Sequence, residues 1–197
     1  MVAFKGCYAL VYRTYMRETG GLLMKKLISA LAVAAAFIGA QATAQDIANM
    51  SDTEFAHIAY TADNIDIRYA HLALALSDNP EIKKFAKTMI SDHEAVNEAA
   101  LELLAKLGAT AQDNAVSQAL NERADNIINE FSQLRGAAFD KAYAENELAY
   151  HQEVNALVEG TMIPNIDNAE VKALFEQGLK IFKAHEKHAE MMVKSVQ

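Results

Sequence analysis

The sequence predicts an all-α fold, an up-and-down four-helix bundle with one additional shorter helix. Apolar residues recur at steps of three and four over long stretches, which is the period of an amphipathic helix. The chain has only 8 glycines and 2 prolines among 197 residues, and alanine, leucine and glutamate are abundant, a composition that favours helices. No stretch shows the strict alternation of a half-buried strand, so helices should supply the whole core.

The first two helices have recognisable ends. Ser51 and Glu54 form a capping-box pattern, and the apolar stripe that follows continues to Leu76. Pro80 suits the first turn of the second helix, and Gly108 is a typical residue to end it. The short segment between them predicts an antiparallel helical hairpin.

Three further helices follow. The third carries apolar residues over 116–134, and Gly136 is expected to kink or break the chain there. The fourth helix is expected over 137–161 and a loop over 162–168. The last helix runs from Ala169 towards Val196.

Residues 24–44 have the order of a secretory signal peptide. Met24 is followed by two lysines, a 14-residue apolar run, and Ala42 and Ala44 at the −3 and −1 positions of a cleavage site. A membrane anchor is the alternative, but the apolar run is shorter than the roughly 20 residues that a spanning helix needs. We therefore expect cleavage after Ala44, export to the periplasm and no transmembrane segment afterwards. An association with the outer membrane is compatible with this location.

Residues 1–23 resemble neither the leader nor the helical domain. They hold the single cysteine, Cys7, and no clear period. A start codon assigned too early explains them, and a longer leader is the alternative. We expect residues 45–197 to form one domain, which then has no disulfide and no thiolate chemistry.

The predicted mature chain is strongly acidic. The full sequence has 18 basic and 26 acidic side chains; five of the basic and one of the acidic ones precede residue 45, which leaves 13 and 25 and a formal net charge of −12. This charge balance argues against a basic surface that would bind nucleic acid or an anionic membrane. It tolerates cationic partners, including metal ions, although solubility alone would also explain it.

Histidines fall on the apolar stripes of three different helices: His93, His151, and one or both of His185 and His188, of which we take His185. Neutral imidazole is a common metal ligand, and bundle cores build metal sites from inward side chains on facing helices. We therefore predict a divalent-metal site with these histidines as ligands, completed by Asp92 and Asp140.

Four further residues are expected to support this polar core: Asp66, Tyr143, Glu147 and His188. The alternative is a purely structural network, in which core histidines bond to carboxylates or tyrosines and fix the register of the helices. A protein of that kind would act through its surface, in envelope stress protection or partner binding. The sequence leaves both interpretations open.

A ferritin-type di-iron site is not expected, since it needs a Glu-x-x-His pair on each of two helices. The chain has one such pair, Glu54 and His57, and none of His93, His151 and His185 follows a glutamate at this spacing. We expect zinc, copper or iron, and a histidine-rich ligand set suits zinc, copper or nickel better than a carboxylate di-iron pair. No phosphate loop or nucleophile motif is found, so no catalytic residue is predicted and a non-enzymatic role is favoured.

Three segments resemble the motifs of a known bacterial family. The segment 85–93, with its Phe-Ala start and its Asp92-His93 end, resembles one motif. Phe139-Asp140-x-x-Tyr143, with His151 eight residues later, resembles a second, and 179–185 resembles a closing Leu-Pro-x-Leu-x-x-His. Over roughly 52–192 the chain is similar to the domain of unknown function 4142 family, often labelled a putative outer membrane protein.

The resemblance implies an exported, ferritin-like helical bundle and no established reaction. Two positions depart from the family pattern. Lys180 stands where the family usually has proline, and Asp66 stands where it tends to carry glutamate, which shortens the reach of that side chain into the core.

Overall fold

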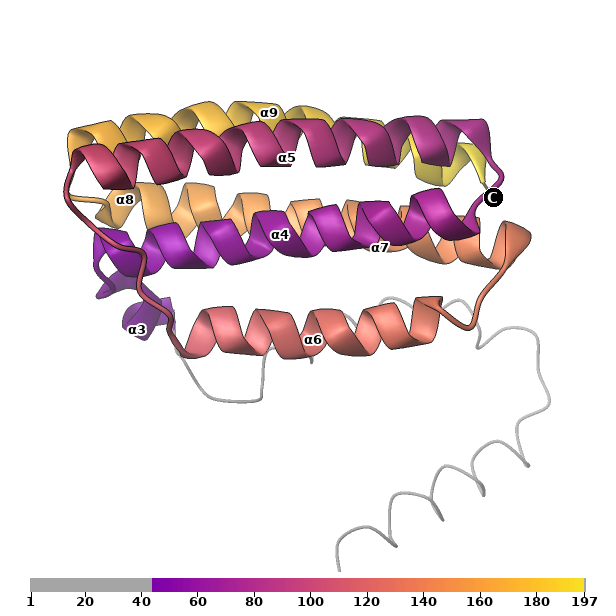
Figure 1. The fold of residues 1–197 in the computed structure, drawn as a ribbon, viewed down its shortest axis with the longest axis horizontal. Helices are drawn as coiled ribbons and strands as arrows, with labels where there is room; N and C mark the ends of the chain where they lie inside the picture. The colour runs from indigo at the N-terminus through magenta and orange to yellow at the C-terminus, as the bar shows by residue number, and fades with distance from the viewer. Residues whose placement is uncertain (1–43, 197) are drawn as a thin grey trace, which may run out of the picture. The chain divides into compact units, whose positions relative to one another are not determined.

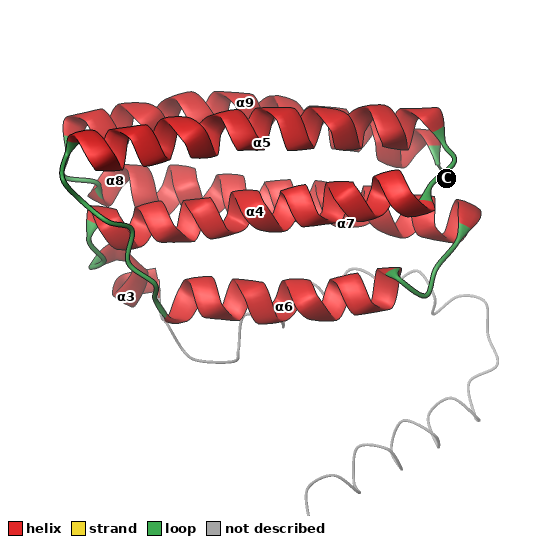
Figure 2. Cartoon of the chain, in the orientation of Figure 1, coloured by secondary structure: helices red, strands yellow, loops and turns green. Residues whose placement is uncertain are grey.

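The computed structural model describes residues 44–196, which form helices joined by short loops (Figure 2). The predicted leader and the extension before it lie outside the described residues, apart from Ala44. Over 44–196 no strand is present, which confirms the all-α prediction. None of the helices there is both long and apolar enough to cross a membrane.

Four long helices form a bundle: α4 (Asp52–Leu76), α5 (Pro80–Lys106), α7 (Gly136–Leu157) and α9 (Ala169–Ser195). Helix α4 packs against α5 and α7, and α9 packs against the same two helices, so the four form a ring. Neighbours around this ring run antiparallel (Figure 1). The shorter α6 (Ala115–Phe131) lies outside the ring against α4 and links the diagonal pair α5 and α7. A short α3 (Ala44–Ala48) precedes them.

The predicted helix ends are explained by their caps. The backbone N–H of Ser51 donates to the Glu54 carboxylate at 2.9 Å, and the Glu54 N–H donates back to Ser51 Oγ at 3.4 Å, which completes the capping box. Asn79 caps α5 by accepting from the N–H of Glu81. Gly108 and Gly136 adopt φ of +64° and +55°, a left-handed conformation that side chains disfavour, so the chain turns at both.

The predicted loop over 162–168 is wrong in its first half. After α7 the chain continues through a π-helical turn, η1 (Val158–Met162), and a three-residue α8 (Ile163–Asn165). Val158 and Met162 are one turn apart and both are buried among apolar side chains. Helical winding keeps both in the core, and only 166–168 remain as the connection to α9.

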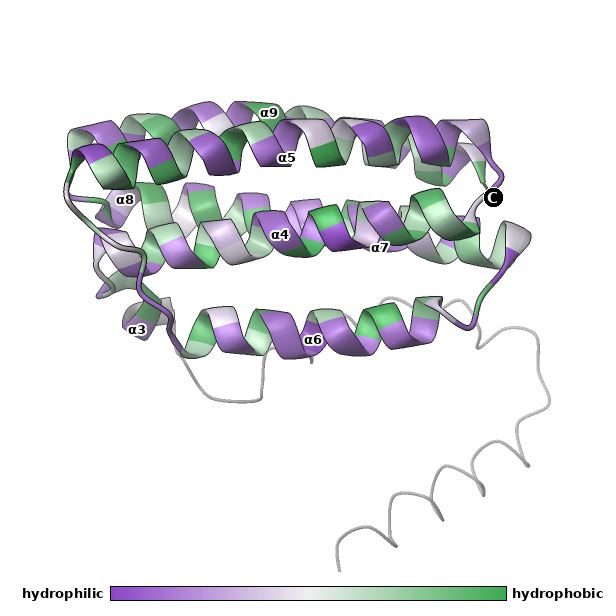
Figure 3. Cartoon of the chain, viewed as in Figure 1, coloured by the Kyte–Doolittle hydropathy of each residue, from purple (hydrophilic) through white to green (hydrophobic). Residues whose placement is uncertain are grey.

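Apolar and polar residues alternate around every long helix, as Figure 3 shows. The inward faces form two apolar clusters, a larger one that includes Phe85 and Phe139 and a smaller one that includes Phe55 and Met162. On α5, α7 and α9 the inward histidine lies between residues of the larger cluster and residues of the smaller one. The bundle therefore has a polar layer where its two apolar clusters meet.

Candidate metal centre

His93 on α5, His151 on α7 and His185 on α9 meet in this polar layer. Their exposed fractions are 4%, 3% and 4%. One ring nitrogen from each lies within 4.8 Å of the other two, and the ring centroids are 5.4 to 5.9 Å apart. Ligand bonds of about 2 Å to a shared ion would therefore require only small side-chain adjustments.

Each of the three rings has one nitrogen held by an oxygen atom of the protein. These oxygens belong to the Asp63 carboxylate for His93 Nδ1 (2.7 Å), the Asp92 carboxylate for His185 Nε2 (2.9 Å) and the Glu147 carbonyl for His151 Nδ1 (2.9 Å). The opposite nitrogens, His93 Nε2, His151 Nε2 and His185 Nδ1, make no hydrogen bond. Metal-bound histidines usually have this arrangement, in which an oxygen acceptor fixes the ring and its tautomer.

Two carboxylates complete the cluster. Asp66 on α4 and Glu147 on α7 are both fully buried. Asp66 Oδ2 lies 3.2 Å from His93 Nε2 and 3.3 Å from His151 Nε2, yet neither contact has hydrogen-bond geometry. Asp66, Glu147 and His151 also place one ligand atom each within 4.8 Å of one another. All four helices of the ring thus contribute to one site.

The charges of this cluster depend on one another. Burial lowers the pKa of His185 to about 4 and also lowers the pKa of His151, so both rings are neutral and able to bind a metal at neutral pH. Burial opposes charge on His93 too, but the Asp66 and Asp63 carboxylates outweigh it and raise its pKa to about 10. Burial, and then the Asp66 charge, raise the pKa of Glu147 well above its ordinary value. Protons on His93 and Glu147 thus provide the positive charge that a cation could supply instead.

The cluster contains many buried polar atoms that lack a hydrogen-bond partner. Besides the three ring nitrogens they are both carboxylate oxygens of Asp66, both of Glu147 and the hydroxyl of Tyr143. Each such atom costs about 1–3 kcal/mol, and native cores leave few of them. Asp66 Oδ2 is in ion-pair contact with His93 Nε2 and His151 Nε2, and a bound metal ion would satisfy these atoms together with the remaining ones.

Asp92, Asp140 and His188 are not among the residues whose ligand atoms converge in this centre. Asp92 contacts the outer side of the His185 ring. Asp140 accepts a hydrogen bond of 2.5 Å from Ser77 Oγ; it precedes His151 by 11 residues, about 16 Å along a helix, so the structure does not bring it to the histidines. His188 lies against the ring of Phe85, with centroids 5.0 Å apart.

Sequence reasoning missed Asp63, the partner of His93. The signal was its spacing from Asp66. Residues three apart share a helix face, so an inward Asp66 implies that Asp63 points to the same side.

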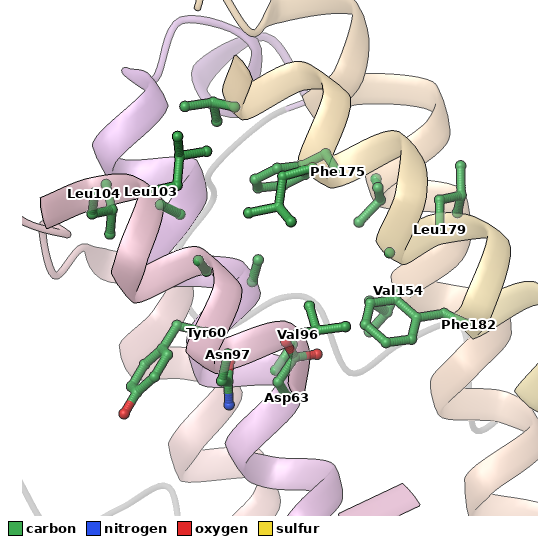
Figure 4. A pocket seen from close by; sticks show the side chains of 18 residues that line it. Tyr60, Asp63, Val96, Asn97, Leu103, Leu104, Val154, Phe175, Leu179 and Phe182 are labelled. Carbon is green, nitrogen blue, oxygen red and sulfur yellow. The ribbon is translucent and has the colours of Figure 1, made fainter. Parts of the chain in front are cut away.

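An apolar cavity of about 50 Å³ adjoins the centre, between the four ring helices. Figure 4 shows Asp63 and Asn97 among its lining residues, with Phe175 and Leu179 contributed by α9. Phe182, which also lines the cavity, stacks on the His93 ring with centroids 4.6 Å apart. The cavity thus reaches the candidate metal centre through Asp63 and Phe182.

The fold and site define a class, a helical bundle whose core gathers three histidines and two carboxylates from four helices. The chain belongs to the family described as Domain of unknown function (DUF4142), whose model matches residues 38–192. Comparison with curated proteins gave no match.

Among solved structures the chain is similar to CopM in the Cu(II)-bound form. The TM-score is 0.57 at 14% sequence identity, and the match covers 75% of this chain and 99% of that one. A likeness at this identity shows the common helical fold alone.

Proposed function

We propose that this protein is exported and binds a divalent transition metal in the core of its bundle. The ligands are His93 Nε2, His151 Nε2 and His185 Nδ1, with an Asp66 oxygen as the fourth. The observation that carries the proposal is the convergence of three buried histidines, each with a ring nitrogen within 4.8 Å of the other two. On each ring one nitrogen is held by an oxygen atom and the other makes no hydrogen bond.

Three histidine nitrogens and one carboxylate oxygen form a ligand set that suits zinc or copper, with iron as a weaker fit. The likeness to CopM, a structure in the Cu(II)-bound form, supports copper as one of the ions to test. The acidic surface of the predicted mature chain favours the approach of cations. The signal-peptide pattern at 24–44 supports export to the periplasm.

The proposed role is binding rather than catalysis. The four candidate ligands would fill a tetrahedral coordination shell, and structural zinc sites are closed in this way, whereas catalytic ones keep a position open for water or substrate. The structural alternative, a polar core that only sets helix register, makes a different prediction for the same variants.

The test is metal titration of protein purified without an affinity tag. Zn²⁺, Cu²⁺ and Fe²⁺ are titrated against the wild type, His93→Ala, His151→Ala and His71→Ala. His71 is exposed on α4 and serves as the matched control. We expect a Kd below about 1 μM for the wild type and His71→Ala, and a loss of at least 100-fold in the other two variants with helix content retained.

Two results would contradict the proposal. The first is the absence of any binding tighter than micromolar in the wild type. The second is a large loss of thermal stability in His93→Ala and His151→Ala with no change in metal content, which would support the structural alternative.

A further inference from the structure

The centre contains more free ligand atoms than one ion can use. A tetrahedral site takes four donors, which the three ring nitrogens and one oxygen of Asp66 supply. The second Asp66 oxygen, both Glu147 oxygens and the Tyr143 hydroxyl then remain buried and without a hydrogen-bond partner.

These remaining atoms lie together. Glu147 on α7 and Asp66 on α4 each place an oxygen within 4.8 Å of the other and of a ring nitrogen of His151. Tyr143 is one turn before Glu147 on the same helix and is also fully buried. Within residues 44–196 the ion-pair partners of the two carboxylates are the His93 and His151 rings. These rings are also the proposed ligands of the first ion.

Two adjacent buried carboxylates are unfavourable as a pair of charges. Like charges in a low-dielectric core repel strongly, and removing each from water costs several kcal/mol. One divalent ion bound by the histidines balances the charges of both carboxylates, but it coordinates only one Asp66 oxygen and leaves the Glu147 oxygens unused. A second cation between the two carboxylates would use these remaining oxygens, and the Asp63 and Asp92 carboxylates behind His93 and His185 would balance its charge.

We infer that the core binds two divalent cations, the second held by Glu147 and by Asp66 Oδ1, with Asp66 bridging both ions. The inference rests on the proposed function, because Asp66 is shared with the histidine-bound ion. The second position has oxygen donors, so it prefers a harder ion than the first. A carboxylate bridge places two such ions about 3.5–4 Å apart.

The test uses Co²⁺ as the probe, because Co²⁺ is paramagnetic and binds both nitrogen and oxygen ligands. Untagged protein is loaded with Co²⁺, freed of loosely bound metal, and analysed for ions per chain and for magnetic coupling by electron paramagnetic resonance. The decisive variant is Glu147→Gln, which keeps the shape of the side chain and removes its charge. Glu145→Gln is the matched control, since Glu145 is exposed on the same helix.

We expect two coupled ions per chain in the wild type and in Glu145→Gln, and one uncoupled ion in Glu147→Gln. One ion in the wild type, unchanged by Glu147→Gln, would overturn the second site and leave the proposed function standing. No bound ion in the wild type would overturn both. Two ions retained in Glu147→Gln would overturn the role of Glu147. If that variant fails to fold, Glu147→Asp replaces it, with weakened binding of the second ion alone as the expected result.

Discussion

Asp63 and His93 are joined across the α4–α5 interface by a hydrogen bond of 2.7 Å between the carboxylate and Nδ1 of the ring. When the ring is neutral, Nδ1–H donates to the carboxylate and the lone pair lies on Nε2. That nitrogen faces Asp66, His151 and the centre of the bundle. Asp63 is therefore placed to orient the His93 ring of the proposed metal site, while its own carboxylate contacts the opposite nitrogen.

Asp63→Asn should weaken metal binding by about 10–100-fold, the usual effect of removing the acceptor behind a ligating histidine. Asparagine keeps the size of the side chain but loses the charge that favours the required tautomer. The measurement is the Kd for Zn²⁺ by competition with a chromophoric chelator. Asp78→Asn, at an exposed position before α5, is the control and should leave the Kd unchanged. Equal affinities in the two variants would contradict the positioning role of Asp63.

The stability of the metal-free protein should decrease as the pH rises from about 6.5 to about 10. Burial alone would lower the pKa of His93, but Asp66 and Asp63 raise it to about 10, against an ordinary value near 6.5 in the unfolded chain. Between these values the folded state binds the proton and the unfolded state does not, so the free energy of unfolding falls by a few kcal/mol. Glu147, whose pKa is also raised, acts in the same direction.

Buried histidines whose pKa is lowered have the opposite effect on the free energy of unfolding, but only at lower pH. The pKa of His185 is lowered to about 4, so its contribution rises only up to about pH 6.5. Urea unfolding of the metal-free protein at a series of pH values measures the slope, and His93→Gln should flatten it. A free energy of unfolding that increases between pH 7 and 9.5 would show that His93 is not charged in the folded protein.

Ser77 and Asp140 connect the α4–α5 loop to the second turn of α7 through a buried hydrogen bond of 2.5 Å. Ser77→Ala should leave the Asp140 carboxylate without this donor and lower the free energy of unfolding by about 1–3 kcal/mol. Metal content and affinity should not change, because Asp140 lies about two to three helical turns beyond Glu147 and His151 by sequence spacing. A loss of bound metal in this variant would place Asp140 back among the ligands, as the sequence predicts.

The helices and their ends follow from local patterns, which explains why they can be predicted from sequence. The Ser51–Glu54 capping box, Pro80 and the turn at Gly136 all act within one or two helical turns. The π-helical turn at 158–162 could not be predicted in this way. It depends on Val158 and Met162 finding space in the core, which is a property of the packed bundle.

In the candidate site, too, one part could be predicted from local patterns and another part depends on the packed bundle. Periodicity places His93, His151 and His185 on inward faces, and the structure brings them together. Periodicity also places Asp140 inward, but it does not give the level along the bundle axis at which each residue lies. That level is set by helix length and by the loops between helices, and it determines that Asp66 and Asp63 meet the histidines whereas Asp140 meets Ser77.

Gly178→Ala should stabilise the protein by about 1 kcal/mol. Glycine inside a helix is less favourable than alanine by roughly this amount. Gly178 lies in the middle of α9 and in the wall of the apolar cavity. A Cβ atom there would lie 3.4 Å from Phe182 Cε2 and 3.9 Å from Val96 Cγ1, which is van der Waals contact without a clash.

Thermal unfolding measures this effect, and 1 kcal/mol corresponds to a rise in Tm of roughly 2–4 °C for a domain of this size. Gly160→Ala is the control, since a Cβ there meets nothing within 4 Å, and it gains backbone restriction alone. A larger gain for Gly178→Ala than for Gly160→Ala would measure the packing of the new methyl group in the cavity. If Gly178→Ala instead lowers the Tm or weakens metal binding, the Phe182 ring cannot shift to accommodate the new methyl group. The cavity would then be a space that the stacking of Phe182 on His93 requires.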